Sequence, residues 1–77
     1  MERVQVYGSS TIESRGYDEE KRILEVSFIN RKSPDHPNVY QYAGVPQSVW
    51  TDWLQAGSAG QFFAAQIKGH YPATRIQ

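Results

Sequence analysis

The alternation of apolar and polar residues in "RILEVSFIN" (22–30) is the feature that most restricts the fold of this chain. Leu24, Val26 and Phe28 occupy one phase of the alternation, and Glu25 and Ser27 occupy the other. A period of two places the two sets on opposite faces of a β-strand. We therefore expect a strand with one buried face and one polar face.

Two further strands are predicted on either side of this one. The segment "STIESRGYD" (10–18) mixes β-branched and polar residues, and a short charged connection follows it. The segment "VYQYAG" (39–44) comes after "RKSPDHPN" (31–38), whose two prolines, Asp and Asn are typical of a loop. Together they predict a three-stranded antiparallel meander, to which Val4 and Val6 could add an edge strand.

Two short helices are predicted after the third strand. Pro46 suits the first turn of a helix, where its missing N–H is no loss. In "PQSVWTDWLQA" apolar residues recur at i and i+4 and form one stripe. The stripe consists of Val49, Trp50, Trp53 and Leu54.

The second helix is predicted from its start and stop signals. Gly57 ends the first helix, and Ser58 followed by Gln61 is a capping-box pattern. Phe63 and Ile67 then share one face, and the last glycine of "QFFAAQIKG" suits the C′ position. The predicted fold is α+β, with a three-stranded antiparallel β-meander followed by two short helices packed on one sheet face.

The length and composition favour one small cytoplasmic domain. The 77 residues are enough for one domain, with a core over about residues 6–72 and a tail over 73–77 that Tyr71 pins down. The chain has no cysteines, no apolar run near the roughly 20 residues of a membrane span and no secretion signal. Eight basic residues balance eight acidic ones, which disfavours high-affinity, sequence-independent binding of nucleic acid.

Tyr40 and Tyr42 are one residue apart on a predicted strand, so both rings project to the same face. They could pack in the core or stack on a ligand, as aromatics do on nucleic-acid-binding sheets. Gln41, in the opposite phase, matches the polar face of the central strand, and this favours the core interpretation. The open face then has no aromatic pair, which disfavours base stacking on it. We expect that face to carry Glu13, Arg15, Glu25, Ser27 and Gln41.

Several short motifs together resemble a known family. "SSTI", "GYD", "LEVSF", "YQY", "GVP", "AGSAGQFF" and "YP" run in the order of the KTSC domain, over about residues 6–76. That domain is named for its occurrence at the C-terminus of some lysyl-tRNA synthetases, and it also occurs alone in bacterial and phage proteins. Its function is unknown, and its attachment to a synthetase has suggested RNA binding. The positions that match its motifs are Tyr40, Tyr42, Val45, Pro46, Ser58, Gly60 and Phe63.

The sequence also departs from the family pattern at three places. The loop 31–38 is several residues longer than the short hairpin turn that the resemblance implies. Arg15 stands where an apolar residue is expected, and Ala64 stands where an Asn is expected. Any polar role of that Asn would be missing here.

The sequence predicts neither a catalytic site nor a metal or cofactor site. Ser9 or Ser10 could be paired with His36 or His70, but no nucleophile elbow surrounds the serines, which better suit hydrogen bonds to the backbone. The two histidines and Asp35 fit no known spacing of metal ligands. We therefore expect a domain that is not an enzyme.

Two hypotheses about function remain. The first is weak RNA binding by four cations, although ordinary solvated charge is the simpler interpretation of them. The second is a protein–protein interaction that uses the loop 31–38 and Trp50, because Trp is common at binding hot spots. The oligomeric state stays open. The four candidate cations are Arg31, Lys32, Lys68 and Arg75.

Overall fold

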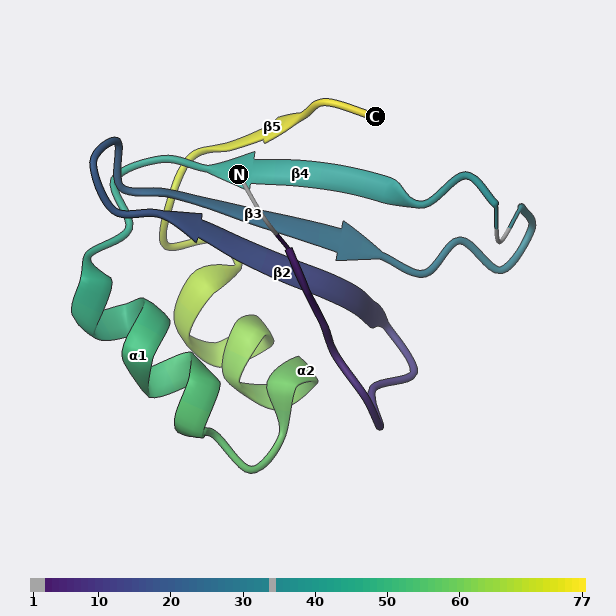
Figure 1. Cartoon of the computed structure of the whole chain (residues 1–77), viewed down its shortest axis with the longest axis horizontal. Coiled ribbons are helices and arrows are strands. Elements are labelled where there is room, and N and C mark those ends of the chain that lie inside the picture. The colour runs from purple at the N-terminus through teal and green to yellow at the C-terminus, as the bar shows by residue number, and fades with distance from the viewer. Residues whose placement is uncertain (1–2, 34) are drawn as a thin grey trace.

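A five-stranded antiparallel sheet and a layer of helices make up this computed structural model, which describes residues 3–33 and 35–77. The helices lie against one face of the sheet (Figure 1). The α+β class and the one-sided helices are confirmed, whereas the predicted count of three strands is wrong. The strands lie in chain order and are β1 (Val4–Gln5), β2 (Ile12–Asp18), β3 (Ile23–Phe28), β4 (Asn38–Tyr42) and β5 (Ala73–Arg75).

The two additional strands extend the sheet at its edges. β1 pairs with β2, and Val4 lies opposite Arg15; β5 pairs with β4, and Arg75 lies opposite Tyr40. Residues 73–77 were predicted as a tail, but three of them form β5. The edge strand suggested by Val4 and Val6 is present as β1, which covers Val4–Gln5. β5 is three exposed residues long, so it carries no apolar alternation from which a strand can be predicted.

The helical layer consists of α1 (Gln47–Gln55) and α2 (Ala59–Phe62), which continues into one turn of π-helix, η1 (Phe63–Ile67). Pro46 is the N-cap of α1. The Ser58 hydroxyl accepts a hydrogen bond from the Gln61 N–H at 3.3 Å, as the capping-box pattern predicts. Gly69, just after η1, has φ of +81°, which suits glycine. No helix among the described residues is long and apolar enough to cross a membrane.

Trp53 joins the two helices to the sheet. It is fully buried, and its indole N–H donates to the Ala59 carbonyl at 3.0 Å. Its ring lies 6.0 Å from that of Phe63, centroid to centroid. Because α1 and α2 share this side chain, their spacing is set by one indole. The other fully buried apolar residues of the described chain are Ile12, Leu24, Val26, Val39, Val45 and Ile67.

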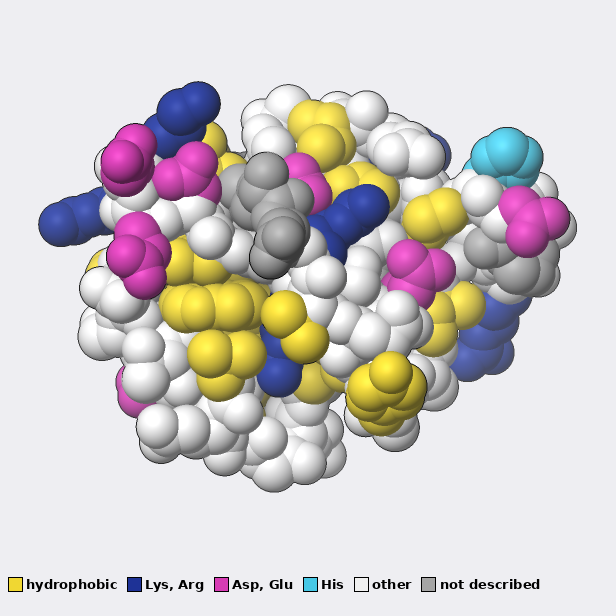
Figure 2. Space-filling view, viewed as in Figure 1, with side chains coloured by type: hydrophobic (Ala, Val, Ile, Leu, Met, Phe, Trp, Pro, Cys, Tyr) yellow, Lys and Arg dark blue, Asp and Glu magenta, His cyan; other side chains and the backbone are white. Residues whose placement is uncertain are grey.

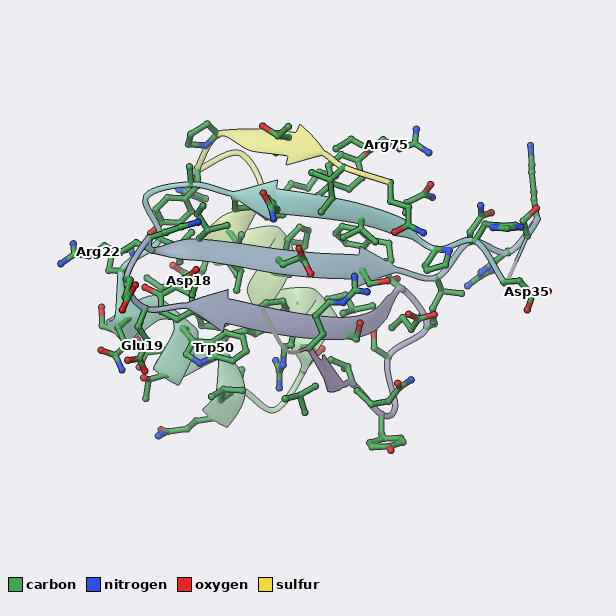
Figure 3. The ribbon with its side chains drawn as sticks, turned by 45° about the horizontal axis from the view of Figure 1, so that its top comes forward. Asp18, Glu19, Arg22, Asp35, Trp50 and Arg75 are labelled. Atoms are coloured by element: carbon green, nitrogen blue, oxygen red, sulfur yellow. The ribbon has the colours of Figure 1, made fainter. Side chains whose placement is uncertain are left out.

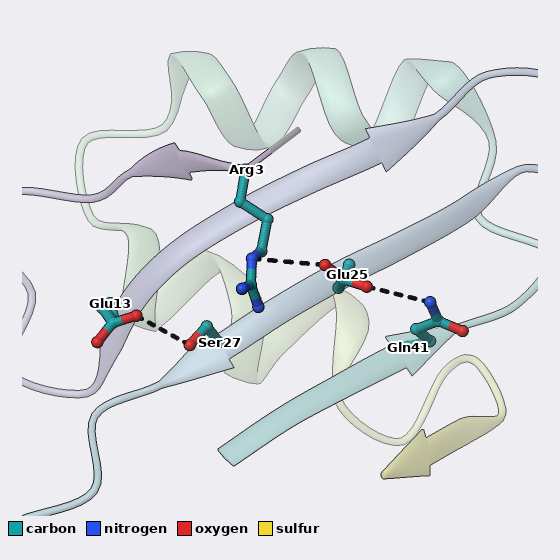
Figure 4. A network of polar contacts seen from close by, with 5 residues as sticks. All are labelled: Arg3, Glu13, Glu25, Ser27 and Gln41. Atoms are coloured by element: carbon teal, nitrogen blue, oxygen red, sulfur yellow. Dashed lines mark hydrogen bonds and ion pairs between the residues drawn. The ribbon is translucent and has the colours of Figure 1, made fainter. Parts of the chain in front are cut away.

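The outer face of the sheet is polar and tied together by hydrogen bonds (Figure 4). The Ser27 hydroxyl donates to Glu13 at 3.1 Å, and the Gln41 amide donates to Glu25 at 3.1 Å. Arg3 forms an ion pair with Glu25 at 3.4 Å. No base-stacking platform is therefore present on the described part of this face.

Arg15 does not lie on that outer face, so its predicted placement is wrong. The register of β2 against β3 shifts between Ile12 and Ser14, and after the shift Arg15 lies opposite Val26. A β-bulge adds one residue to a strand and so reverses the phase of all that follow it. Arg15 therefore points toward the helices.

The Arg15 guanidinium packs against the helical layer. Its carbon lies 4.8 Å from the Trp53 ring centroid, and Nη1 donates to the Trp53 carbonyl at 3.3 Å. Its Nε is buried without a hydrogen-bond partner. Burial lowers the pKa of Arg15 from its ordinary value. The contact combines a favourable cation–π geometry with an unsatisfied donor.

Replacing Arg15 by Met tests the balance between these effects. We expect Arg15→Met to leave the free energy of unfolding unchanged or to raise it by about 1 kcal/mol, because a well-packed apolar side chain often replaces a buried charge without loss. Arg15→Ala should lower it by about 1–2 kcal/mol, since the stem that covers Trp53 is lost. Urea denaturation measures both. Equal losses in the two variants would show that the guanidinium itself stabilises the fold.

Candidate functional site

A groove opens between the inner face of the sheet and the helical turn η1. It has a volume of about 640 Å³ and is lined mainly by apolar and aromatic side chains. We call it the aromatic groove. Six of its lining residues carry the argument that follows, and they are Phe28, Tyr40, Tyr42, Phe63, Lys68 and Tyr71.

Edge-to-face contacts between aromatic rings build the walls of the aromatic groove. The Phe63 ring lies 5.2 Å from Phe28 and 5.5 Å from Tyr42, with interplanar angles of 67° and 76°. Phe28 meets Tyr40 in the same way at 5.7 Å. Such contacts are the preferred geometry of aromatic pairs, so the walls are held in a defined arrangement.

The two tyrosines of the sheet have different roles in this groove. Both lie on the helix-covered face, with Tyr42 inside the core cluster and Tyr40 packed against it. Tyr42 is 6% exposed, whereas Tyr40 is half-buried and lines the opening. Tyr40 is therefore part of the core and part of a surface that a ligand can reach. Sequence periodicity gives the face of a residue but not whether the neighbouring layer covers it completely.

The π-helical turn decides which residues face the aromatic groove. The Lys68 N–H donates to the Phe63 carbonyl at 2.9 Å, a bond that spans five residues instead of four. Phe63 and Ile67 are buried, while Ala64 and Lys68 stay exposed and line the groove. The predicted α-helical spacing gave the buried residues correctly and missed the wider turn.

The structure brings only some of the four candidate cations to the aromatic groove. Lys68 lines it directly. Arg75 lies opposite Tyr40 on the neighbouring strand and donates to the Asn38 side chain at 2.7 Å, so it projects to the same face. Arg31 and Lys32 are exposed in the loop between β3 and β4. Figure 3 shows this loop, in which Asp35 is labelled, extending beyond the end of the sheet. No acidic residue of the described chain lines the groove.

A second, polar hollow lies beside the aromatic groove. It has a volume of about 420 Å³ and is formed by two segments, residues 7–11 and residues 57–61. The Ser9 hydroxyl accepts hydrogen bonds from the N–H groups of Thr11 at 3.2 Å and Ile12 at 3.0 Å. This matches the expected backbone role of Ser9. Sequence reasoning did not predict that the "SSTI" and "AGSAGQ" motifs meet across a hollow, because they are far apart in the chain.

The histidines are not brought into a metal or catalytic group. His36 donates its N–H to the Ser33 carbonyl within the loop, and His70 follows η1 and donates to the Ile67 carbonyl. Among the described residues, no three His, Asp, Glu or Cys side chains lie close enough together to hold a metal ion.

Trp50 lies on another part of the surface. It is half-buried and stacks on Tyr17 at 5.7 Å with an interplanar angle of 14°. Figure 3 shows Trp50 and Asp35 at opposite ends of the sheet. A single protein partner would therefore have to span the sheet to contact both the loop and Trp50, and the interaction hypothesis stays a prediction.

Two tyrosines have pKa values above the ordinary value of 10.0. Burial raises the pKa of Tyr17; Arg22 opposes the rise, and Glu19 and Asp18 reinforce it. Burial also raises the pKa of Tyr42, with a smaller contribution from Tyr40. The Tyr17 hydroxyl donates to the Val45 carbonyl at 2.6 Å, a bond that ionisation would remove.

These shifts predict a loss of stability at alkaline pH. The folded state holds the phenol protons more tightly than the unfolded chain does, so their stabilising effect is complete below pH about 10 and is lost as the pH rises through the folded-state values. Urea unfolding between pH 8 and 11 should show this fall. In the double variant Tyr17→Phe/Tyr42→Phe the free energy of unfolding should fall less steeply with pH. An equally steep fall in that variant would show that other groups cause the loss of stability.

Comparison with known proteins identifies the family to which this chain belongs. The family model of the KTSC domain matches residues 8–71. An uncharacterised protein of Stutzerimonas stutzeri is 39% identical over 77 residues, with 99% of each chain covered. The crystal structure of a KTSC domain protein from Yersinia pestis is similar with a TM-score of 0.83 and 38% identity, over 99% of this chain and 97% of that one. The chain therefore belongs to the KTSC domain family.

Proposed function

We propose that this KTSC domain is a non-catalytic module that binds single-stranded RNA in the aromatic groove. The observation that carries the proposal is a groove lined by the half-buried rings of Tyr40 and Tyr71, with the cations Lys68 and Arg75 nearby and no carboxylate of the described chain in its lining. Proteins that hold single strands combine aromatic rings for the bases with cations for the backbone. The attachment of related domains to a tRNA synthetase agrees with this ligand.

The geometry favours a single strand over a duplex. An unpaired base is flat and apolar on both faces, so it can insert between aromatic side chains such as Tyr40 and Tyr71. Bases in a duplex are already stacked and cannot enter a groove of this kind. Lys68 then lies where it can meet a phosphate beside the inserted base.

The charge distribution predicts weak binding. The formal net charge is zero, and only Lys68 and Arg75 are associated with the groove. A longer RNA could also contact Arg31 and Lys32, which are exposed in the loop before β4. Few phosphate contacts mean little release of counterions, so affinity should depend modestly on salt.

The lining also supports binding without catalysis. Proton transfer in enzymes relies mostly on imidazole and carboxylate side chains. The lining residues of the aromatic groove include neither. Its one buried titratable group, Tyr42, has a raised pKa and so stays protonated at neutral pH.

The RNA proposal predicts a specific pattern of salt dependence. A short oligouridylate should bind the wild type, and Lys68→Ala and Arg75→Ala should each reduce the slope of log affinity against log salt by about 0.7, as for one phosphate contact to a single strand. Lys21→Ala is the matched control, because Lys21 is exposed in the turn between β2 and β3. Fluorescence titrations at several salt concentrations measure the slopes. Equal slopes in all four proteins would contradict the proposal.

A second candidate function is protein binding at Trp50. Figure 2 shows apolar side chains gathered on the face over α1, and Leu54 of α1 is 45% exposed. If this surface binds a partner, Trp50→Ala should abolish its capture from an extract of the source organism, whereas Lys68→Ala should leave it intact. Capture that depends on Lys68 and not on Trp50 would instead favour the aromatic groove.

A further inference from the structure

The aromatic groove and the polar hollow are neighbours with a common wall. Thr11 and Gly60 line both of them. The two hollows therefore meet at a saddle, which we define by these two residues. The aromatic groove lies on one side of this saddle and the polar hollow on the other.

Gly60 has no side chain to obstruct the saddle, and the fold does not require a glycine at this position. It lies in α2 with a helical backbone, and a Cβ placed on it would meet no atom within 4 Å. Glycine is among the least favourable residues within a helix. Neither backbone conformation nor packing explains glycine at this position, whereas close approach of a ligand to the backbone does.

The polar hollow offers hydrogen-bond donors to a ligand that extends over the saddle from the aromatic groove. The Ser9 and Ser58 hydroxyl oxygens already accept bonds from backbone N–H groups. Their own protons are therefore free to donate to an acceptor. No carboxylate of the described chain lines the hollow, so an anionic acceptor meets no repulsion there.

An exposed aromatic side chain stands at the polar hollow. Tyr7 lines it and is 88% exposed, more than any other large apolar residue of the described chain. A side chain so placed can stack on a second base, while hydroxyl donors hold the phosphate and ribose that join it to the first.

We infer that the polar hollow is a second RNA subsite, and that the phosphodiester between two nucleotides crosses the saddle at Gly60. This inference rests on the proposed function, because the first base occupies the aromatic groove. The minimal ligand is then a dinucleotide, with one base beside Tyr40 and Tyr71 and the next beside Tyr7.

The test compares a mononucleotide with a dinucleotide on the intact chain. Uridine monophosphate and the dinucleotide of uridine are titrated, and amide chemical shifts and affinities are recorded. We expect the dinucleotide to bind about tenfold more tightly, as stacking of one further base predicts. Its binding should shift the amides of Ser9, Ser10 and Ser58, which line only the polar hollow, whereas the mononucleotide should shift only those of the aromatic groove.

Gly60→Ala is the decisive variant. Its added methyl group should weaken the dinucleotide by about tenfold more than it weakens the mononucleotide, which contacts only the groove side of Gly60. Its melting temperature should be unchanged or higher, because alanine favours the helix. Ser48→Ala is the control, since Ser48 is exposed in α1 and lines neither hollow, and it should bind both ligands normally.

The possible outcomes separate the two proposals. Normal dinucleotide binding by Gly60→Ala, or shifts confined to the aromatic groove, would overturn the second subsite while RNA binding stands. No binding of either ligand or of longer oligouridylate would overturn both proposals. Loss of dinucleotide binding in Tyr7→Ala, with the mononucleotide unaffected, would support the subsite independently of Gly60.

Discussion

The burial of Trp53 is the contact on which the rest of the structure depends. One indole is packed between the sheet and both helices, stacks on Phe62 at 6.5 Å and donates to the carbonyl of the first residue of α2. A domain this small buries only about 60% of its unfolded surface, so few side chains can set the spacing of its layers. Trp53 does so on the α1 side, and Ile67, which is also fully buried, packs the end of η1 into the same core.

The aromatic groove lies beside this packed core. Phe63 and Ile67 of η1 are buried in the core, whereas Tyr40 and Tyr71 are half-buried and line the groove. Half-buried rings in a small core forgo stabilisation that full burial would provide. Local departures of this kind from the most stable packing are expected at functional sites. The groove and the polar hollow together give the chain one continuous concave surface, to which the matched motif residues Tyr40, Ser58 and Gly60 contribute.

The expectation for Arg15 failed for a geometric reason that the sequence pattern does not show, and the expectation for Tyr40 and Tyr42 held with one refinement. The alternation on β2 predicted an outward Arg15, but a bulge between Ile12 and Ser14 reversed the phase and turned it onto Trp53. The question of whether Tyr40 and Tyr42 are core or ligand platform assumed that a sheet face is either covered or open. Tyr42 is buried in the core, and Tyr40 packs against that core on the same face while part of its ring lines the aromatic groove.

The sequence by itself determined the central strands, both helix starts, the polar outer face at Glu25 and Gln41 and the membership of the family. Each of these depends on residues within a few positions of one another, where periodicity, capping and turn chemistry act directly. Only the tertiary structure decided the edge strand β5, the inward Arg15 and the meeting of residues 7–11 with residues 57–61 at one hollow. Those features arise because segments distant in the chain pack together, and the free energy of that packing is not encoded in any local pattern.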